Sequence, residues 1–305
     1  MEKIIDLHTH LDTLGVIASF IGKRCDHTIR LEEHIKDNYK IILSVSMYVP
    51  LLSSYESLRT LILNFKKKAL KYPGVKLIKT KKDLDSDFLT GLILHIESAR
   101  TITNHKTQLP ELYELGIRGI IPMHFVNNQI GFSCDDIRSK LSALNPSNQG
   151  LKKYGKEFIQ HCNSLGIWLD LAHCSDQTAK DILNLSNSVL ISHIGVRDLI
   201  SRDRNQTVCL MKKVANKGGV IGITPWTHLI GHENNAFNNQ LHYLINQGLE
   251  NNICIGSDFG APISTLSKNN SIYHLSREIN ADFKSLKDKI KWKNAYNFFN
   301  QALPN

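Results

Sequence analysis

The sequence has no apolar run of the 18 or more residues that a membrane span requires. Its first residues, Met1-Glu2-Lys3, lead straight into Ile4 without the basic and apolar regions of a secretion signal. The six cysteines include no Cys-X-X-Cys pair, which argues against a structural zinc knuckle and for reduced thiols. We therefore expect no membrane partner and a cytoplasmic location.

Acidic residues are in the minority, with 28 Asp and Glu against 37 Lys and Arg and a formal net charge of +9. Several of the lysines lie between positions 66 and 82, around one predicted helix and its exit. No DNA- or RNA-binding motif accompanies them, so they are interpreted as a solvated helix face. We expect no nucleic-acid partner, and only a modest attraction for anionic substrates.

Short, nearly continuous apolar runs alternate with amphipathic stretches along the 305 residues. Such runs are typical of parallel strands that are buried on both faces. Eight are predicted as strands: Lys3–Leu7, Ile41–Met47, Gly91–Ile96, Gly119–Met123, Ile167–Ala172, Ser188–Ser192, Gly219–Thr224 and Ile253–Ser257. The clearest predicted helices are Tyr55–Leu70, Leu151–Leu165, Thr178–Leu185 and Val208–Lys217. This alternation favours a single (β/α)8 TIM-type barrel domain over residues 1–305, and no glycine-rich dinucleotide fingerprint follows the first strand.

Polar side chains stand where most of these strands end. His8 and His10 follow the first strand, and Asp258 leaves the last one. The strands between them are followed by Glu97, His124, His173 and His193. All strand ends of a barrel open onto one face, so we expect these side chains to converge. Imidazoles and carboxylates without a thiolate suit zinc, or another borderline divalent ion, in a catalytic site.

The sequence pattern says less about the roles of two further histidines and of one long connection. His124 fits a metal ligand, an oxyanion stabiliser or a rim histidine, and the spacing does not choose between them. His95 points to the opposite side of its strand from Ile96 and is interpreted as structural. The connection Gly131–Gly150 is unusually long, which is typical of a functional lid.

Taken in order, the motifs resemble those of the membrane (renal) dipeptidase family of zinc peptidases. The likeness runs from Asp6 to about Ala302, and its order and spacing are specific although each motif alone is weak. It comprises Asp6 with His8, Ile96-Glu97, Leu115-Gly116-Ile117-Arg118 leading to His124, Gly150-Leu151 with Tyr154-Gly155, Leu165-Gly166 leading to Asp170-Leu171-Ala172-His173, Ser192-His193, Arg204-Asn205, Gly218-Gly219-Val220 and Ile255-Gly256-Ser257-Asp258.

The resemblance implies a dipeptidase with two divalent metal ions, of which zinc is the expected one. His8 and the residue two positions on, His10, would bind one ion, and His173 and His193 the other, with Glu97 as the bridge. A zinc-bound hydroxide would hydrolyse the peptide bond of dipeptides or of similar small N-acyl amino acids.

The resemblance also implies roles toward the substrate. His124 would polarise the scissile carbonyl, and Asp258 would handle the proton and orient the free amine. Arg204 would hold the substrate carboxylate, for which its planar guanidinium is well matched.

The chain departs from the family pattern in three places. His10 stands where the family usually has aspartate, which swaps an anion for a neutral group and leaves the site more positive. Gly260 follows Phe259, so a second aspartate near Asp258 is missing, and Gln206-Thr207 replaces a proline and an aspartate.

Other readings stay open. A His-X-His motif at a first strand also occurs in other metal-dependent amidohydrolases and in phosphoesterases of related folds, although no strand here ends in the lysine that many of them use. A non-catalytic relative would have no use for Asp258, His124 and Arg204. A homodimer is left open by the sequence.

Overall fold

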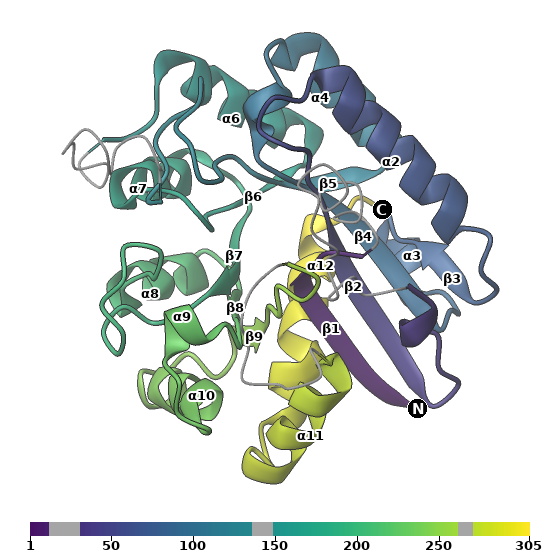
Figure 1. Ribbon diagram of the computed structural model, residues 1–305, viewed down its shortest axis with the longest axis vertical. Coiled ribbons are helices and arrows are strands. Elements are labelled where there is room, and N and C mark those ends of the chain that lie inside the picture. The colour runs from purple at the N-terminus through teal and green to yellow at the C-terminus, as the bar shows by residue number, and fades with distance from the viewer. Residues whose placement is uncertain (12–30, 136–148, 262–270) are drawn as a thin grey trace.

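The computed structural model describes residues 1–11, 31–135, 149–261 and 271–305, which are built around a parallel β-barrel (Figure 1). Neighbours around the barrel pair in parallel, and β9 pairs back onto β1 at Asp6 and Ile255. The predicted (β/α)8 TIM-type barrel is therefore confirmed. Its strands are β1 (Glu2–Thr9), β2 (Tyr39–Met47), β4 (Thr90–Glu97), β5 (Ile117–Ile121), β6 (Trp168–Asp170), β7 (Val189–Ile194), β8 (Ile221–Ile223) and β9 (Ile253–Ile255).

A further short strand, β3 (Val75–Leu77), lies outside the closed circle. It pairs with the first half of β4, opposite residues 90–92, whereas β5 pairs with the second half, residues 94–97. β3 is not among the predicted strands, because its three residues are only half-buried and do not form an apolar run.

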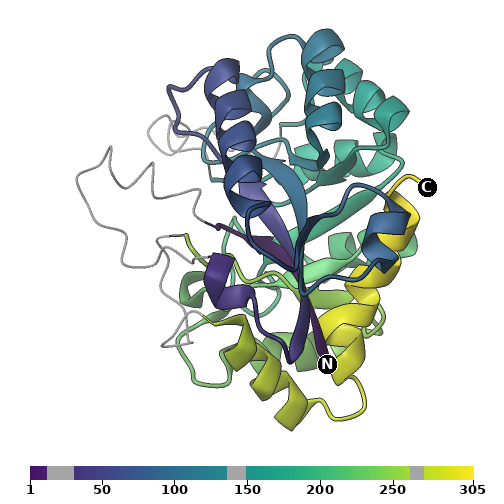
Figure 2. The same ribbon diagram turned by 90° about the vertical axis from the view of Figure 1, so that its right-hand side faces the viewer.

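Helices surround the strands, as Figures 1 and 2 show. In α7 the Ser175 hydroxyl accepts the N–H of Thr178, and Ala179, Ile182 and Leu183 form the buried face at helical spacing. The longer helices are α2 (Tyr55–Ala69), α4 (His105–Leu115), α6 (Lys153–Leu165), α7 (Asp176–Leu185), α8 (Val208–Asn216), α10 (Ala236–Asn246), α11 (Ile272–Asp282) and α12 (Asn294–Ala302), and the shorter ones are α3 (Lys81–Asp85) and α9 (Thr227–Ile230).

The predicted helices are α2, α6, α7 and α8, and each ends within two residues of its predicted bounds. Two further helices are not among those predicted: α4, which contains Pro110, and the asparagine-rich α10. The strand predicted over Ile167–Ala172 is β6, and it is shorter than predicted because the chain turns towards a left-handed residue at His173.

The barrel interior and α12 share one apolar core. Ile5, Ile42, Trp168 and Phe299 belong to it, and α12 lies beside the N-terminus in Figure 2. Trp168 fits because its neighbour on β5 is Gly119, where a Cβ atom would lie 2.0 Å from the indole nitrogen. The N-terminal end of the barrel is thus filled by the end of the chain.

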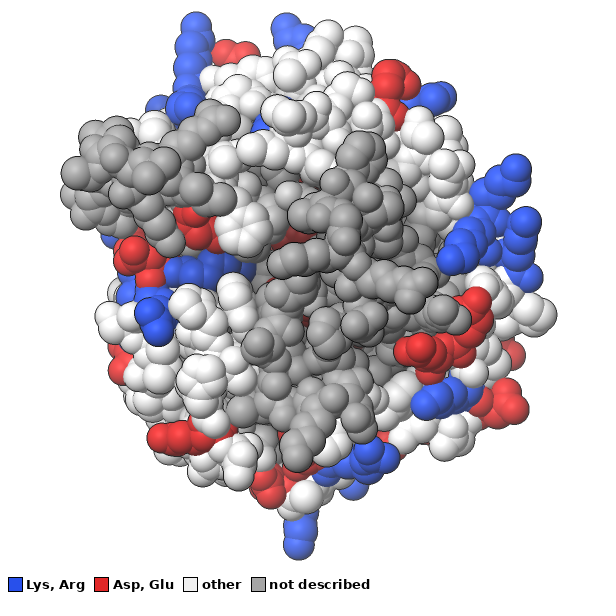
Figure 3. Space-filling view, viewed as in Figure 1, with Lys and Arg blue, Asp and Glu red and all other residues white. Residues whose placement is uncertain are grey.

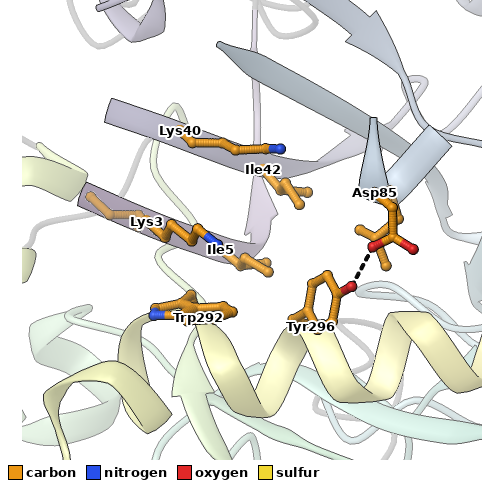
Figure 4. Close-up of a pocket in the computed structure, with 9 residues that line it drawn as sticks. Lys3, Ile5, Lys40, Ile42, Asp85, Trp292 and Tyr296 are labelled. Carbon is orange, nitrogen blue, oxygen red and sulfur yellow. Dashed lines mark hydrogen bonds between the residues drawn. The ribbon is translucent and has the colours of Figure 1, made fainter. Parts of the chain in front are cut away.

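A cavity of about 270 Å³ remains at this end (Figure 4). Lys3 lies over the Trp292 ring at 4.6 Å, and the Tyr296 hydroxyl donates to Asp85. Lys3 is exposed and Lys40 is half-buried, and the cavity is lined by strand starts rather than strand ends.

The remaining surface carries mixed charge. On the face shown in Figure 3, Lys and Arg side chains lie mainly around the edge, with Asp and Glu among them. No helix within the described ranges is long and apolar enough to cross a bilayer. The cysteines in these ranges, Cys134, Cys162, Cys174, Cys209 and Cys254, are free thiols, and Cys25 lies outside them.

The Glu2 carboxylate connects β1 to the C-terminal helices through three hydrogen bonds. Glu2 Oε1 accepts from Lys291 Nζ at 2.5 Å, from Ser276 Oγ at 2.8 Å and from Asn280 Nδ2 at 3.0 Å. Burial raises the pKa of Glu2, but these hydrogen bonds outweigh it and lower that pKa to about 2. Lys291 is 3% exposed, so its ammonium group depends on this partner.

We expect Glu2→Gln to lower the free energy of unfolding at pH 7 by about 3 kcal/mol, since it leaves a buried ammonium group without a counter-charge. The double variant Glu2→Gln/Lys291→Met should recover most of that loss in denaturant titrations. The folded-state pKa lies below the ordinary 4.5, so this stabilisation is present above pH 4.5 and is lost as the pH falls towards 2. A single variant as stable as the double one would contradict this account.

Candidate metal centre

The side chains predicted to converge do so at the C-terminal ends of the strands. His8 lies in β1, Glu97 ends β4 and His193 lies in β7. Asp258 and His173 follow β9 and β6. All five are at most 7% exposed, and the other two members of the group are His10, 5% exposed, and His124, whose side chain is 10% exposed.

The Glu97 carboxylate lies between two sets of imidazoles. Its Oε2 atom is 3.4 Å from His10 Nε2 and 3.7 Å from His8 Nε2. Its Oε1 atom is 3.4 Å from His173 Nε2, and His124 and His193 lie near the same oxygen at 3.5 and 3.9 Å. The two oxygens of one carboxylate thus face different histidine groups.

Within each group the ligand atoms lie close together. His8 Nε2 and His10 Nε2 are 3.2 Å apart, and Asp258 Oδ1 is 3.3 Å from His10 Nε2 and 3.6 Å from His8 Nε2. In the second group, His173 Nε2 and His193 Nε2 are also 3.2 Å apart. Asp258 is not among the predicted metal ligands, but its Oδ1 atom lies with the first histidine pair.

Burial and these contacts determine the pKa values of the site residues. Burial raises the pKa of Glu97, but the surrounding His124, His8 and His10 side chains hold it well below its ordinary value. Burial is also the largest influence on His124 and lowers its pKa to about 3. Glu97 is therefore an anion and His124 a neutral imidazole near pH 7.

Strained backbone marks the same strand ends. Four non-glycine residues in the described ranges have left-handed φ angles: Ser98 at 76°, Phe125 at 53°, His173 at 62° and Asp258 at 57°. Each is a site residue or directly follows one. Such conformations cost about 1–3 kcal/mol and persist where the surroundings impose them, which is typical of functional sites.

Two buried aspartates hold neighbouring strand ends together. Asp6 Oδ1 accepts the backbone N–H groups of His8 at 3.2 Å and Ser257 at 2.9 Å. Asp170 Oδ1 likewise accepts from Ala172 and Ser192, both at 3.0 Å. Asp6 thereby joins the segments that carry His8 and Asp258, and Asp170 joins those that carry His173 and His193. Both aspartates belong to the family motifs in the sequence, but no role was predicted for them.

Asp135 is a site residue that the sequence analysis did not identify. Its Oδ2 atom is 2.7 Å from His173 Nδ1, on the side of the ring away from Glu97, and 3.7 Å from Arg204 Nε. It lies in the predicted lid Gly131–Gly150, of which residues 136–148 fall outside the described ranges. A carboxylate in a long polar loop gives no periodic signal, so only the fold reveals its place.

A closed parallel barrel that gathers histidines and carboxylates at its strand ends defines a metal-dependent hydrolase of the barrel class. A sequence model of the membrane dipeptidases, peptidase family M19, matches residues 32–303. The chain belongs to this family, and the predicted metallopeptidase of the dipeptidase type is confirmed at that level.

Individual proteins are similar to this chain over different shares of its length. An uncharacterized protein of Klebsiella pneumoniae is 24% identical over 68% of this chain and 80% of its own length. An uncharacterized dipeptidase of Schizosaccharomyces pombe is 27% identical over 55% of this chain, which spans only 41% of that protein. A Rhodobacter sphaeroides metallopeptidase, solved with a phosphinate mimic of L-Ala-D-Ala, has the same fold, with a TM-score of 0.78, 18% identity and 99% coverage of both chains.

We expect Asp135→Asn to weaken metal binding at the His173–His193 pair by about 10–100-fold, the usual effect of removing a carboxylate behind a ligand histidine. Asp176→Asn is the matched control, because Asp176 also pairs with an arginine, Arg197, but contacts no site histidine. Zinc titration against a competing chelator measures both variants. Equal zinc affinity in the two variants would remove Asp135 from the metal centre.

Proposed function

We propose that the protein is a dipeptidase with two divalent metal ions, zinc being the expected metal. The observation that carries the proposal is the position of Glu97, whose two oxygens face His8 with His10 and His173 with His193. One carboxylate that contacts two separate histidine pairs has the arrangement of a bridge between two ions.

The donor atoms fit zinc in type and in spacing. They are imidazole nitrogens and carboxylate oxygens, and ligand atoms about 2.1 Å from a tetrahedral ion lie roughly 3.4 Å from one another. The Nε2 atoms of each histidine pair are 3.2 Å apart, close to that separation. When bound, two such ions would make water a good nucleophile near neutral pH and offset negative charge on the substrate.

We propose two roles for Asp258. Its Oδ1 atom is directed at the His8–His10 pair and would contribute a negative charge to the first ion, where His10 supplies none. The Oδ2 atom would then take up and release the proton during hydrolysis and orient the free amine of the substrate.

His124 is proposed to polarise the scissile carbonyl. A neutral imidazole can donate an N–H to the carbonyl oxygen, and burial keeps this ring neutral by lowering its pKa to about 3. The rings of Tyr48 and Phe125 pack against it with centroid distances of 4.7 and 4.1 Å. They hold the imidazole beside Glu97.

Arg204 is proposed to bind the carboxylate of a dipeptide or of a small N-acyl amino acid. It is 6% exposed, and its Nε and Nη1 atoms have no hydrogen-bond partner among the described residues. Asp135 lies 3.7 Å from Nε, too far for a hydrogen bond. Unsatisfied donors on a buried guanidinium are costly, and a substrate carboxylate would satisfy them.

The metal requirement can be tested with Glu97→Gln. A neutral amide cannot balance two dications, so we expect the variant to lose bound zinc and dipeptidase activity together. Glu114→Gln, which changes an exposed glutamate, is the control and should retain both. Elemental analysis of the purified proteins gives the metal content, and wild-type protein that takes up no zinc would overturn the proposal.

The substrate carboxylate can be tested with Arg204→Ala. Leaving that anion unpaired costs about 2–5 kcal/mol, which corresponds to a fall in kcat/KM of at least about 30-fold. The exposed neighbour Arg202 provides the control Arg202→Ala, which we expect to behave like the wild type. Equal turnover of a dipeptide and its C-terminal amide by the wild type would argue against this role of Arg204.

A further inference from the structure

His95 lies directly behind His8, on the side away from the other site residues. Its Nε2 atom is 3.0 Å from His8 Nδ1, and its Nδ1 atom is 2.9 Å from the Ser44 hydroxyl. The three side chains come from β4, β1 and β2, and each residue is at most 3% exposed. Ser44, His95 and His8 thus form a buried polar row that leads to the metal centre.

The row contacts His8 at Nδ1 and leaves its Nε2 atom facing the other site residues. Nε2 faces Glu97 Oε2 and His10 Nε2, so this is the nitrogen available to a metal ion. A neutral imidazole that binds through Nε2 has its only N–H at Nδ1, and in a buried site this N–H needs an acceptor.

His95 is the better placed of two candidate acceptors. The other, Ser192 Oγ, is 3.5 Å from His8 Nδ1 but only 2.7 Å from His193 Nδ1, and it therefore serves His193. His8 must then donate to His95 Nε2, which requires the His95 proton to be on Nδ1. That Nδ1–H can donate to Ser44 Oγ, which accepts it at the far end of the row.

We propose that His95 and Ser44 are positioning residues that set the tautomer and ring orientation of His8 for the first metal ion. The inference rests on the two-metal centre proposed above. His10 provides no substitute, because its Nδ1 atom has no hydrogen-bond partner among the described residues. Of the first histidine pair, His8 is therefore the member whose ring this row orients.

The test is a zinc titration of four variants against a chromophoric chelator. His95→Leu removes the acceptor, and we expect one of the two zinc sites to weaken by about 10–100-fold while the other keeps its affinity. In His95→Gln the amide oxygen can accept in place of Nε2, so most of the affinity should return. Ser44→Ala should weaken the same site to a smaller extent.

His34→Leu is the matched control. His34 is 5% exposed, and neither of its ring nitrogens has a hydrogen-bond partner among the described residues. It contacts none of the site residues, so its loss should leave both zinc affinities unchanged. This variant measures what the removal of a buried histidine does to the fold in general.

Wild-type affinity at both sites in folded His95→Leu protein would overturn the inference, and so would an equal loss at both sites. Circular dichroism and the melting temperature of the zinc-free proteins establish folding. If the leucine variant does not fold, His95→Gln must keep both sites and Ser44→Ala must weaken one of them, or the inference fails. A wild type that binds no zinc would overturn the metal centre as well, whereas an unchanged His95→Leu variant overturns this inference alone.

Discussion

The structure depends on one buried carboxylate that must remain charged. Glu97 is 3% exposed, and burial of an anion costs several kcal/mol unless partners compensate it. The Ser46 hydroxyl donates to Oε2 at 2.8 Å, and the remaining compensation comes from imidazoles delivered by other strands. The barrel satisfies this demand because all its strands end at the same face, so that residues distant in the sequence surround one point.

Hydrogen bonds from backbone N–H groups to two buried carboxylates connect neighbouring strand ends. Asp6 and Asp170 each connect two neighbouring segments, and the left-handed residues His173 and Asp258 lie just beyond those connections. These aspartates have raised pKa values, about 7 and about 6, because burial disfavours their charged forms. Asp6 and Asp170 are therefore less fully ionised near neutral pH than Glu97 is. The backbone N–H groups that donate to them are uncharged.

The sequence allowed the barrel and most of the candidate site to be predicted, because both have a local signature. Apolar runs such as Ile253–Ser257 indicate strands buried on both faces, and a histidine or carboxylate at the end of such a run is conspicuous. Asp135 and His95 have no such signature. Asp135 lies in an irregular loop, and the role of His95 depends on its distance to His8, which the alternation of side chains along one strand cannot give.

The contacts of β1 with β9 and with Lys291 affect how the protein folds during synthesis on the ribosome. β1 emerges before the other strands of the barrel, and its partner β9 and the Lys291 that pairs with Glu2 follow roughly 250 to 290 residues later. At about 5–20 residues per second, the first strand waits on the order of ten seconds to a minute for these contacts. Its apolar residues, such as Ile4 and Ile5, are exposed during that interval unless β2 covers them, and long-range closure of this kind is slow. A nascent chain of this protein should therefore depend on chaperones more than its finished barrel does.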